Sequence, residues 1–252
     1  MLNELARWET QARSAPLTLS LARCEDEVRE AQRLRYKVFA EEIGARLPNP
    51  ESGLDRDLFD PFCEHLLVRD ARTLEVVGTY RLLTPRGARE AGCFYSQTEF
   101  DLTRLNHLLD RTLEVGRAAV HPAYRNGGVI TLLWAGLARF IEQHGFDYLI
   151  GCASIGMADG GHAAASLFRR IGIEHMSPVE WRVFPRNRLP LESLDNTLNV
   201  PLPPLLKGYI RVGCYVCGAP AWDPDFNTAD LMLILPRALM NPRYSRHFLP
   251  HG

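Results

Sequence analysis

The chain has 252 residues, of which 46% are hydrophobic and 23% are charged, and its formal net charge is −1. This balance is typical of a globular protein and excludes a disordered chain. The near-neutral charge excludes the strongly basic surface of a nucleic-acid-binding protein.

The first elements in chain order predict an α/β protein. Residues 1–15 lack the apolar stretch of a signal peptide, which predicts a cytoplasmic location. Residues 17–21 alternate between leucine and polar residues, as in a half-buried strand. A helix is expected over 25–42, and Arg35 lies in the middle of its apolar side, so its guanidinium should point to the interior. Residues 43–63, rich in Pro, Gly, Asn and Asp, predict a long ordered loop.

Strands then alternate with helices. The most apolar segment, 129–141, is interrupted by Arg139 and is shorter than the roughly 20 residues that a membrane-spanning helix needs. After residue 184 the periodicity weakens and prolines accumulate, before a short helix and one or two strands within 205–235. This order predicts a mixed sheet. The expected elements are strands at 65–69 and 76–83, a short helix after 94–101, strands at 113–120 and 148–153, helices at 127–144 and 162–171, and a strand near 180–184.

The strand 113–120 leads through the sequence HPAYRNGG directly into a helix. Glycines at this point let the backbone approach a ligand closely, and the unpaired amides of the first helical turn favour an anion. The turn therefore predicts a phosphate or pyrophosphate site, although a plain strand-to-helix turn would look the same. The residues expected to form this site are Val120, Arg125, Asn126, Gly127 and Gly128.

This turn resembles the thioester-binding motif of GNAT acyltransferases. Arg125 and Gly128 match the motif, whereas Ile130 stands where the family usually has Gly or Ala, which counts against acetyl coenzyme A as the donor. The resemblance implies a strand bulge near Gly116, where the central strands of the GNAT fold splay and the acyl thioester lies. Strict alternation would otherwise separate Glu114 and Arg117 onto opposite faces of their strand.

Four charged side chains stand where the pattern predicts apolar ones. Burying an unpaired charge is costly, so we expect them to share a network with acidic residues of the 43–63 loop. Such a cluster is either a structural ion network or a polar substrate pocket. The four residues are Arg35, Arg81, Glu114 and Arg117, and the expected partners are Asp57 and Asp60.

The sequences LRYKVF, DLFD, VVGTYRLL and LEVGRAAV resemble those of acyl-homoserine lactone synthases. That family acylates the amine of S-adenosylmethionine from acyl carrier protein. The chain departs from it by lacking a Trp in the segment EEIGARL and by carrying a further C-terminal segment. The matching positions are Arg35, Phe39, Asp57, Asp60, Arg81, Glu114 and Arg117.

From about residue 34 to residue 235, the chain resembles the ornithine N-acyltransferases of ornithine-lipid synthesis, in the segments CEHLLVRD, LEVGRAAVHPAYRNGGVITLLW and PPLLKGYIRVGCYVCGAPAWDPDFNTADLMLIL. This resemblance implies one domain over 1–252, with a GNAT-like core at 16–184 whose twisted mixed sheet has splayed central strands flanked by helices, and a C-terminal extension at 185–252 that packs on the core. It implies transfer of a (3-hydroxy)acyl chain from acyl carrier protein to the α-amine of L-ornithine, giving lyso-ornithine lipid. The phosphopantetheine of the carrier would be the donor, with no permanently bound cofactor and no metal. A lipid product favours peripheral contact with the inner face of the membrane.

Residue roles follow from this chemistry. Glu114 is the expected base, with Arg117 beside it, and His65 is the alternative base. Asp57 and Asp60 would bind the ammonium groups of a diamino acid, while one of the buried arginines would bind its carboxylate. The expected substrate-binding residues are Arg35, Phe39, Asp57, Asp60 and Arg81.

Other interpretations remain open from the residues alone. Acyl carrier protein is acidic, so Arg125, Arg169 and Arg170 are candidate contacts with it. Cys214 and Cys217 form a CxxC that is typical of buried thiols, because nothing nearby completes a zinc site. The alternative functions are a homoserine-lactone-type signal synthase and a non-enzymatic, haemolysin-like lipid-binding protein.

Overall fold

The structure, a computed structural model, describes residues 16–242. Residues 1–15 and 243–252 lie outside the described residues, and with them the expectation about a signal peptide. Within 16–242 no helix is long and apolar enough to cross a membrane.

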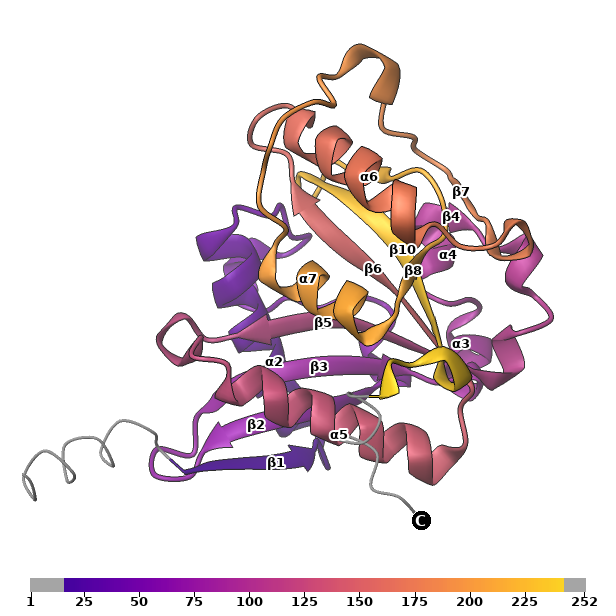
Figure 1. The fold of residues 1–252 in the computed structure, drawn as a ribbon. Helices are drawn as coiled ribbons and strands as arrows, with labels where there is room; N and C mark the ends of the chain where they lie inside the picture. Colours follow the sequence, from indigo (N-terminus) through magenta and orange to yellow (C-terminus); the bar gives the residue numbers. More distant parts are fainter. Residues whose placement is uncertain (1–15, 243–252) are drawn as a thin grey trace, which may run out of the picture.

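One eight-stranded sheet runs through the protein in the order β1-β2-β3-β5-β6-β10-β8, with β9 paired to β10 (Figure 1). Its β5 and β6 are parallel and its other pairs are antiparallel, so the predicted mixed sheet is confirmed. A separate two-stranded sheet joins β4 (Phe100–Asp101) to β7 (Phe184–Pro185). The strands of the main sheet are β1 (Leu17–Leu21), β2 (Glu64–Asp70), β3 (Val76–Leu83), β5 (Thr112–Val120), β6 (Tyr148–Gly156), β8 (Tyr215–Val216), β9 (Ala221–Asp223) and β10 (Thr228–Pro236).

Helices cover both faces of this sheet. The predicted helix over 25–42 is present, but its last six residues, Lys37–Glu42, form a π-helix, an irregularity that is frequent at functional sites. α5 and α7 lie on one face and α2 lies on the other (Figure 1). The helices are α2 (Glu25–Tyr36), α3 (Pro85–Ala91), α4 (Ser96–Glu99), α5 (Gly128–His144), α6 (His162–His175) and α7 (Pro204–Val212).

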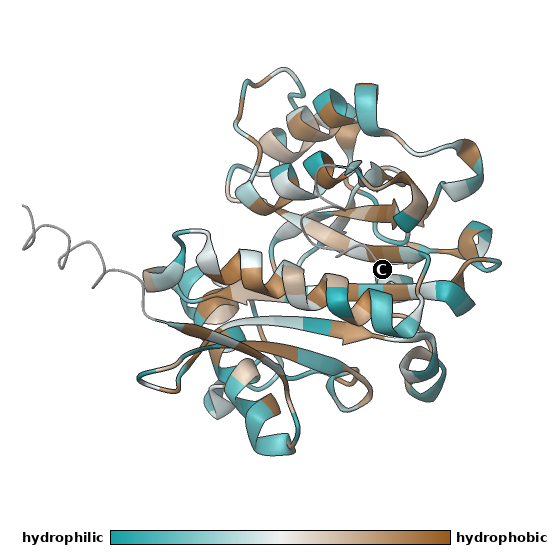
Figure 2. Ribbon diagram, turned by 60° about the horizontal axis from the view of Figure 1, so that its bottom comes forward, coloured by the Kyte–Doolittle hydropathy of each residue, from teal (hydrophilic) through white to brown (hydrophobic). Residues whose placement is uncertain are grey.

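Hydrophobic side chains fill both interfaces of the sheet. The larger cluster joins the strands to α5, α6 and α7, with Leu133, Leu167 and Leu206 among its buried members. A second cluster on the opposite face includes Phe100 and Met232. Figure 2 shows the corresponding pattern, with mainly hydrophobic central strands and hydrophilic residues on the loops and outer helical turns.

Two local predictions differ from the structure. The strand expected near 180–184 is wrong, because Val179–Trp181 is a 3-10 turn and only Phe184–Pro185 pairs with another strand. Pro178 begins the 3-10 turn and Pro185 lacks a backbone donor, so a longer strand is disfavoured. α3 was missed, although Thr84 caps it by accepting from the Gly87 amide at 3.1 Å.

Residues after 184 contribute to the main sheet itself. β10 pairs with β6 over nine residues and lies between β6 and β8. The CxxC lies beside β8, with Cys214 and Cys217 both buried, and burial raises the pKa of each thiol to about 12. Both side chains are therefore protonated at neutral pH.

Candidate active site

The two parallel strands of the sheet diverge along their length. β5 and β6 pair only from Thr112 to Glu114, opposite Tyr148 to Ile150, although both strands continue well beyond this point. Gly151 lies where they part, and a Cβ on it would come within 2.3 Å of the Val115 carbonyl oxygen. Only glycine therefore allows the strands to come this close before they separate.

The bulge predicted near Gly116 is confirmed. Thr79 pairs with Ala119 and Arg81 with Gly116, so β5 has one more residue than β3 between these pairs. Arg117 takes up the extra residue with a φ of 52°, a conformation that is uncommon for a residue with a side chain. Because of this change of phase, Glu114 and Arg117 line the same cavity.

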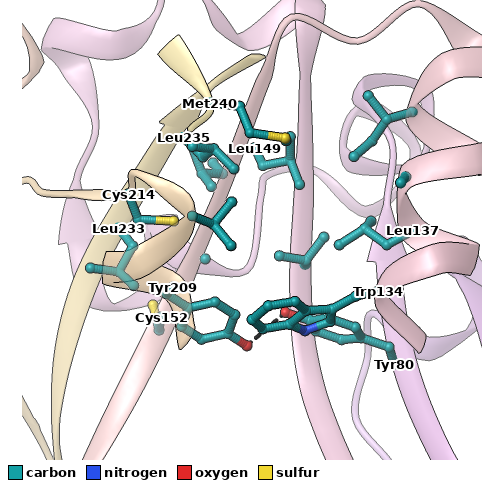
Figure 3. Close-up of a pocket in the computed structure, with 16 residues that line it drawn as sticks. Tyr80, Trp134, Leu137, Leu149, Cys152, Tyr209, Cys214, Leu233, Leu235 and Met240 are labelled. Carbon is teal, nitrogen blue, oxygen red and sulfur yellow. Dashed lines mark hydrogen bonds between the residues drawn. The ribbon is translucent and has the colours of Figure 1, made fainter. Parts of the chain in front are cut away.

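An apolar cavity occupies the gap between the diverging strands. Its volume is about 730 Å³, including its opening to solvent, and Figure 3 shows side chains from α5, α7, β3, β6 and β10 around it. The Tyr80 and Tyr209 hydroxyls are 2.7 Å apart at one end of it, where Trp134 stacks on Tyr209. The lining residues include no charged side chain among those described. We call this cavity the apolar arm; an alkyl chain is the ligand that such a lining favours.

A second cavity of about 1080 Å³, again including its opening, adjoins the first. Four residues line both cavities, so the two lie side by side and share a wall, and we call them together the cleft. We call the second cavity the charged arm, because five of its lining residues are ionisable acids or arginines. The shared residues are Tyr80, Val115, Cys152 and Tyr209, and the charged ones are Arg81, Glu114, Arg117, Asp223 and Asp230.

The predicted network of buried charges is present behind this cleft. Arg35 is fully buried and donates to Asp55 at 2.8 Å and to both carboxylate oxygens of Asp60, at 2.9 and 2.8 Å. Arg81 donates to Asp57 at 2.6 Å and to Asp60 at 2.9 Å. Burial alone would raise the pKa of Asp60, but the two guanidinium groups outweigh it and hold that pKa well below its usual range.

This network changes the expected role of several residues. Neither Arg35, Asp57 nor Asp60 lines the apolar arm or the charged arm. Arg35 is paired with Asp55 and Asp60, and Asp57 is paired with Arg81 and Arg117, so direct contact with a substrate is not supported for these three. They instead hold Arg81 in the wall of the charged arm. Phe39 does line that arm, and its ring meets Phe226 edge-on at 5.9 Å.

Of the three buried arginines, Arg117 is the one with the longest distances to acidic partners. Its guanidinium lies between the rings of Tyr95 and Phe226, at 4.9 and 4.7 Å, which fixes its plane. It approaches Asp57 and Asp55 only at 3.3 and 3.4 Å. A carboxylate entering the charged arm could therefore be bound by Arg117 without breaking a short ion pair.

Glu114 is buried in the wall of the charged arm. It accepts hydrogen bonds from the amides of Tyr95 and Ser96, each at 2.7 Å, and from the Ser96 hydroxyl. Burial raises the pKa of Glu114, although these hydrogen bonds act in the opposite direction. A carboxylate with a raised pKa can accept a proton from an amine more readily than an exposed one can.

His65 lies away from both arms. Its Nε2 is 3.2 Å from the Asp60 carbonyl oxygen, and burial lowers its pKa to about 4, so the ring is neutral at pH 7. The residue faces Arg81 across the β2–β3 hairpin, outside the lining of the cleft. These contacts support a structural role and not that of a base.

The predicted phosphate turn is exposed at the start of α5. Gly127 caps the helix with a φ of 95°, and Asn126 Oδ1 accepts from the Gly128 amide at 3.1 Å. Arg125 is already engaged: its Nε donates to the Val120 carbonyl at 3.1 Å and its Nη2 to Glu42 at 2.7 Å. An anion would have to compete with Glu42 for this arginine.

Several site residues escaped the sequence analysis. One signal could have found Asp230, because it interrupts the apolar strand TADLMLILP as Arg81 interrupts its own strand. No local signal points to the remaining residues, which come from short connecting elements. The missed residues are Tyr95, Ser96, Glu99, Asp223, Phe226 and Asp230.

Comparison with known proteins gives consistent results. Residues 34–135 match the family model of an acetyltransferase (GNAT) domain. The chain is 37% identical to the L-ornithine N(alpha)-acyltransferase of Agrobacterium fabrum (strain C58), over 94% of this chain and 86% of that protein. It is 34% identical to the L-ornithine N(alpha)-acyltransferase of Brucella abortus (strain 2308), over 94% and 90%. The crystal structure of the AHL synthase LasI covers 94% of this chain and 96% of its own with a TM-score of 0.54 at 12% identity, which confirms the GNAT-like fold class.

Proposed function

Because the chain belongs to the family of L-ornithine N(alpha)-acyltransferases, we propose that it transfers an acyl chain from the phosphopantetheine of acyl carrier protein to the α-amine of L-ornithine. The chain is an acyltransferase, and its substrates are an amino acid and an acyl donor. The carrier protein, the (3-hydroxy)acyl chain and the lyso-ornithine lipid product belong to the proposal.

The observation that carries this proposal is that the two arms of the cleft adjoin each other. The apolar arm suits an alkyl chain and the charged arm suits an amino acid, and they meet at Tyr80, Val115, Cys152 and Tyr209. A thioester carbonyl held at this junction would have its chain on one side and the attacking amine on the other. Such juxtaposition removes much of the entropic barrier to a bimolecular reaction, so no covalent acyl-enzyme is required.

The donor would extend along β5 from the turn at Gly127. Its phosphate would lie at the first turn of α5, where unpaired amides favour an anion. Backbone amides at the bulge beside Arg117 are not all committed to the regular ladder, and one of them would stabilise the oxyanion of the tetrahedral intermediate. Arg125, Arg169 and Arg170, all exposed, are the proposed contacts with the acidic carrier protein.

The acceptor would bind in the charged arm with its carboxylate on Arg117. Glu114 would take a proton from the α-ammonium, and the freed amine would attack the thioester carbonyl carbon. A carbon–nitrogen bond then forms and the carbon–sulfur bond breaks, and the departing thiolate takes up the proton that the nitrogen gives up as the amide forms. Arg81 would hold the acceptor from the side, since it lines the same arm.

The remaining predicted residues would act by positioning. Arg35, Asp57 and Asp60 would fix Arg81 through the buried network, and His65 would anchor the hairpin beneath it. A lipid product favours peripheral contact with a membrane surface, which also belongs to the proposal.

Thiol release from a purified 3-hydroxyacyl carrier protein tests the proposal. We expect release with ornithine to exceed release with lysine, glutamine or glycine, and the lipid product to be detected by mass spectrometry. Release with S-adenosylmethionine but not with ornithine would support a signal synthase instead. No release with any amine, together with binding to lipid vesicles, would support a lipid-binding protein.

A further inference from the structure

Three carboxylates lie close together beside the charged arm. Glu99 is the last residue of α4, Asp223 ends β9, and Asp230 lies in β10. One carboxylate oxygen from each lies within 4.8 Å of the others. Asp223 and Asp230 line the charged arm, and Asp230 is only 4% exposed. We call this group the carboxylate cluster.

The negative charge of this cluster is not compensated by the protein. Within residues 16–242, none of the three carboxylates forms an ion pair with a Lys, Arg or His. Both carboxylate oxygens of Glu99 are buried without a hydrogen bond of good geometry. Asp230 accepts from the Thr228 hydroxyl at 3.0 Å, and Asp223 accepts from the Asp225 and Phe226 amides. Glu99 is thus a buried carboxyl whose neighbours are the Asp230 carboxyl and the Tyr95 hydroxyl, and neither of these groups is a cation.

Electrostatics leads to the same conclusion. Burial, and next to it the charge of Asp230, raise the pKa of Glu99 to about 9. Burial also raises the pKa of Asp230. Close carboxylates in a desolvated site need either a proton or a cation between them. At neutral pH the three carboxyl groups by themselves therefore retain a proton, which an entering cation would displace to solvent.

The cluster lies close to the reacting centre. α4 connects the two, because Ser96 binds Glu114 and Glu99 follows three residues later on the same helical turn. The Cys152 Sγ is 3.6 Å from the Ser96 hydroxyl, and burial, followed by the charges of Glu99 and Asp230, raises the pKa of this thiol. Across the charged arm, the ring of Phe226 covers Arg117 while its amide donates to Asp223.

We propose that the carboxylate cluster binds the side-chain ammonium of the acceptor amino acid and so selects a diamino acid. This inference rests on the proposed function, since it assumes that an amino acid occupies the charged arm. Arg117 would hold the α-carboxylate at one end while the cluster holds the cationic end, leaving the α-amine beside Glu114. The role first expected of Asp57 and Asp60 would then belong to Glu99, Asp223 and Asp230.

The geometry suits an ammonium group. An ammonium has three donors, and acceptors at about 2.8 Å in tetrahedral directions lie about 4.6 Å from one another. All three carboxylate oxygens of the cluster lie within 4.8 Å of one another, so one ammonium could contact all of them. A bound divalent cation is the rival occupant of three carboxylates, and the experiment below distinguishes it.

The test compares two acceptors that differ only in the side-chain amine. Ornithine and norvaline share a carbon skeleton, and norvaline lacks the δ-ammonium. We expect Asp230→Asn and Glu99→Gln each to lower kcat/KM for ornithine by about 10- to 100-fold, the worth of one charge-assisted hydrogen bond, while the value for norvaline changes by less than about threefold. Asp225→Asn is the matched control, because Asp225 is an exposed acid in the same turn, and it should leave the ratio unchanged.

Equilibrium binding of both amino acids, measured by calorimetry on the same variants, separates this inference from the proposed function. Ornithine binding that weakens in Asp230→Asn, with norvaline binding unchanged, supports the cluster even if no acyl transfer is found. An unchanged ornithine-to-norvaline ratio in both variants would overturn it, as would an equal loss for both acceptors in a variant that melts like the wild type. Activity that a chelator removes and a divalent metal restores would also overturn it, in favour of a metal site.

Discussion

Replacement of Asp60 by Asn tests how much the buried charge network contributes to the stability of the fold. Three arginines, Arg35, Arg81 and Arg117, face three aspartates in this network, and Asp60 accepts from Arg35 twice, from Arg81 and from the Gln32 amide. Asn keeps one acceptor oxygen, but its amide would direct N–H groups at a guanidinium and leave one positive charge uncompensated. Removing one partner of a buried ion pair costs about 3–5 kcal/mol. For a chain of this length each kcal/mol shifts Tm by about 2–4 °C, so we expect a Tm lowered by about 6–20 °C.

The assay is thermal unfolding followed by circular dichroism at one scan rate, with urea unfolding as an independent measure. Glu42→Gln is the matched control, because it breaks the Arg125–Glu42 pair, whose side chains are 43% and 39% exposed. A surface pair contributes about 0–1 kcal/mol, so this variant should lose at most about 4 °C. If Asp60→Asn melts no lower than Glu42→Gln, the network does not stabilise the fold in the way described.

Three further predictions concern the cleft. Glu114→Gln should lower kcat for thiol release by about 10²- to 10⁴-fold because it removes the base. Ser96→Ala keeps the carboxylate and should lower kcat by less than about tenfold. A kcat for Glu114→Gln within about tenfold of wild type would exclude Glu114 as the base. Met240 lies at the end of the apolar arm away from Cys152 (Figure 3), so Met240→Trp should shorten the preferred acyl chain by about two to four carbons. Each methylene that no longer fits costs about 0.8 kcal/mol of burial. Competition between thioesters of different chain length measures the preference, and an unchanged profile would contradict the prediction. Glu99 has a pKa raised from 4.5 to about 9, so the stability associated with its protonated form is complete below pH 4.5 and is lost as the pH rises through 9. Gln does not titrate, so the difference in unfolding free energy between Glu99→Gln and wild type should move in favour of the variant by about 1 kcal/mol per pH unit between pH 5 and pH 9. Thermal unfolding at several pH values measures this through Tm. A difference that stays constant with pH would contradict the buried Glu99–Asp230 pair.

The charges in the cleft show how far pattern reasoning extends. Arg35 and Arg81 were found because each interrupts an apolar face, and the same rule applied to β10 would have found Asp230. The rule locates a buried charge but not its partner or its direction. Asp57 and Asp60 were therefore assigned to a substrate ammonium, whereas in the structure they bind arginines behind the cleft.

The resemblance to GNAT acyltransferases implied the bulge near Gly116, whereas the sequence by itself determined the types and order of most elements and the burial of the interrupting charges. These follow from periodicity and from the cost of burying an unpaired charge, which act within one element. Only the tertiary structure decided that β10 would pair with β6, that α7 would cover the gap between β5 and β6, and that Glu99, Asp223 and Asp230 would meet. Those arrangements depend on contacts between residues far apart in the chain, where packing and strand pairing select among many sequence-compatible partners.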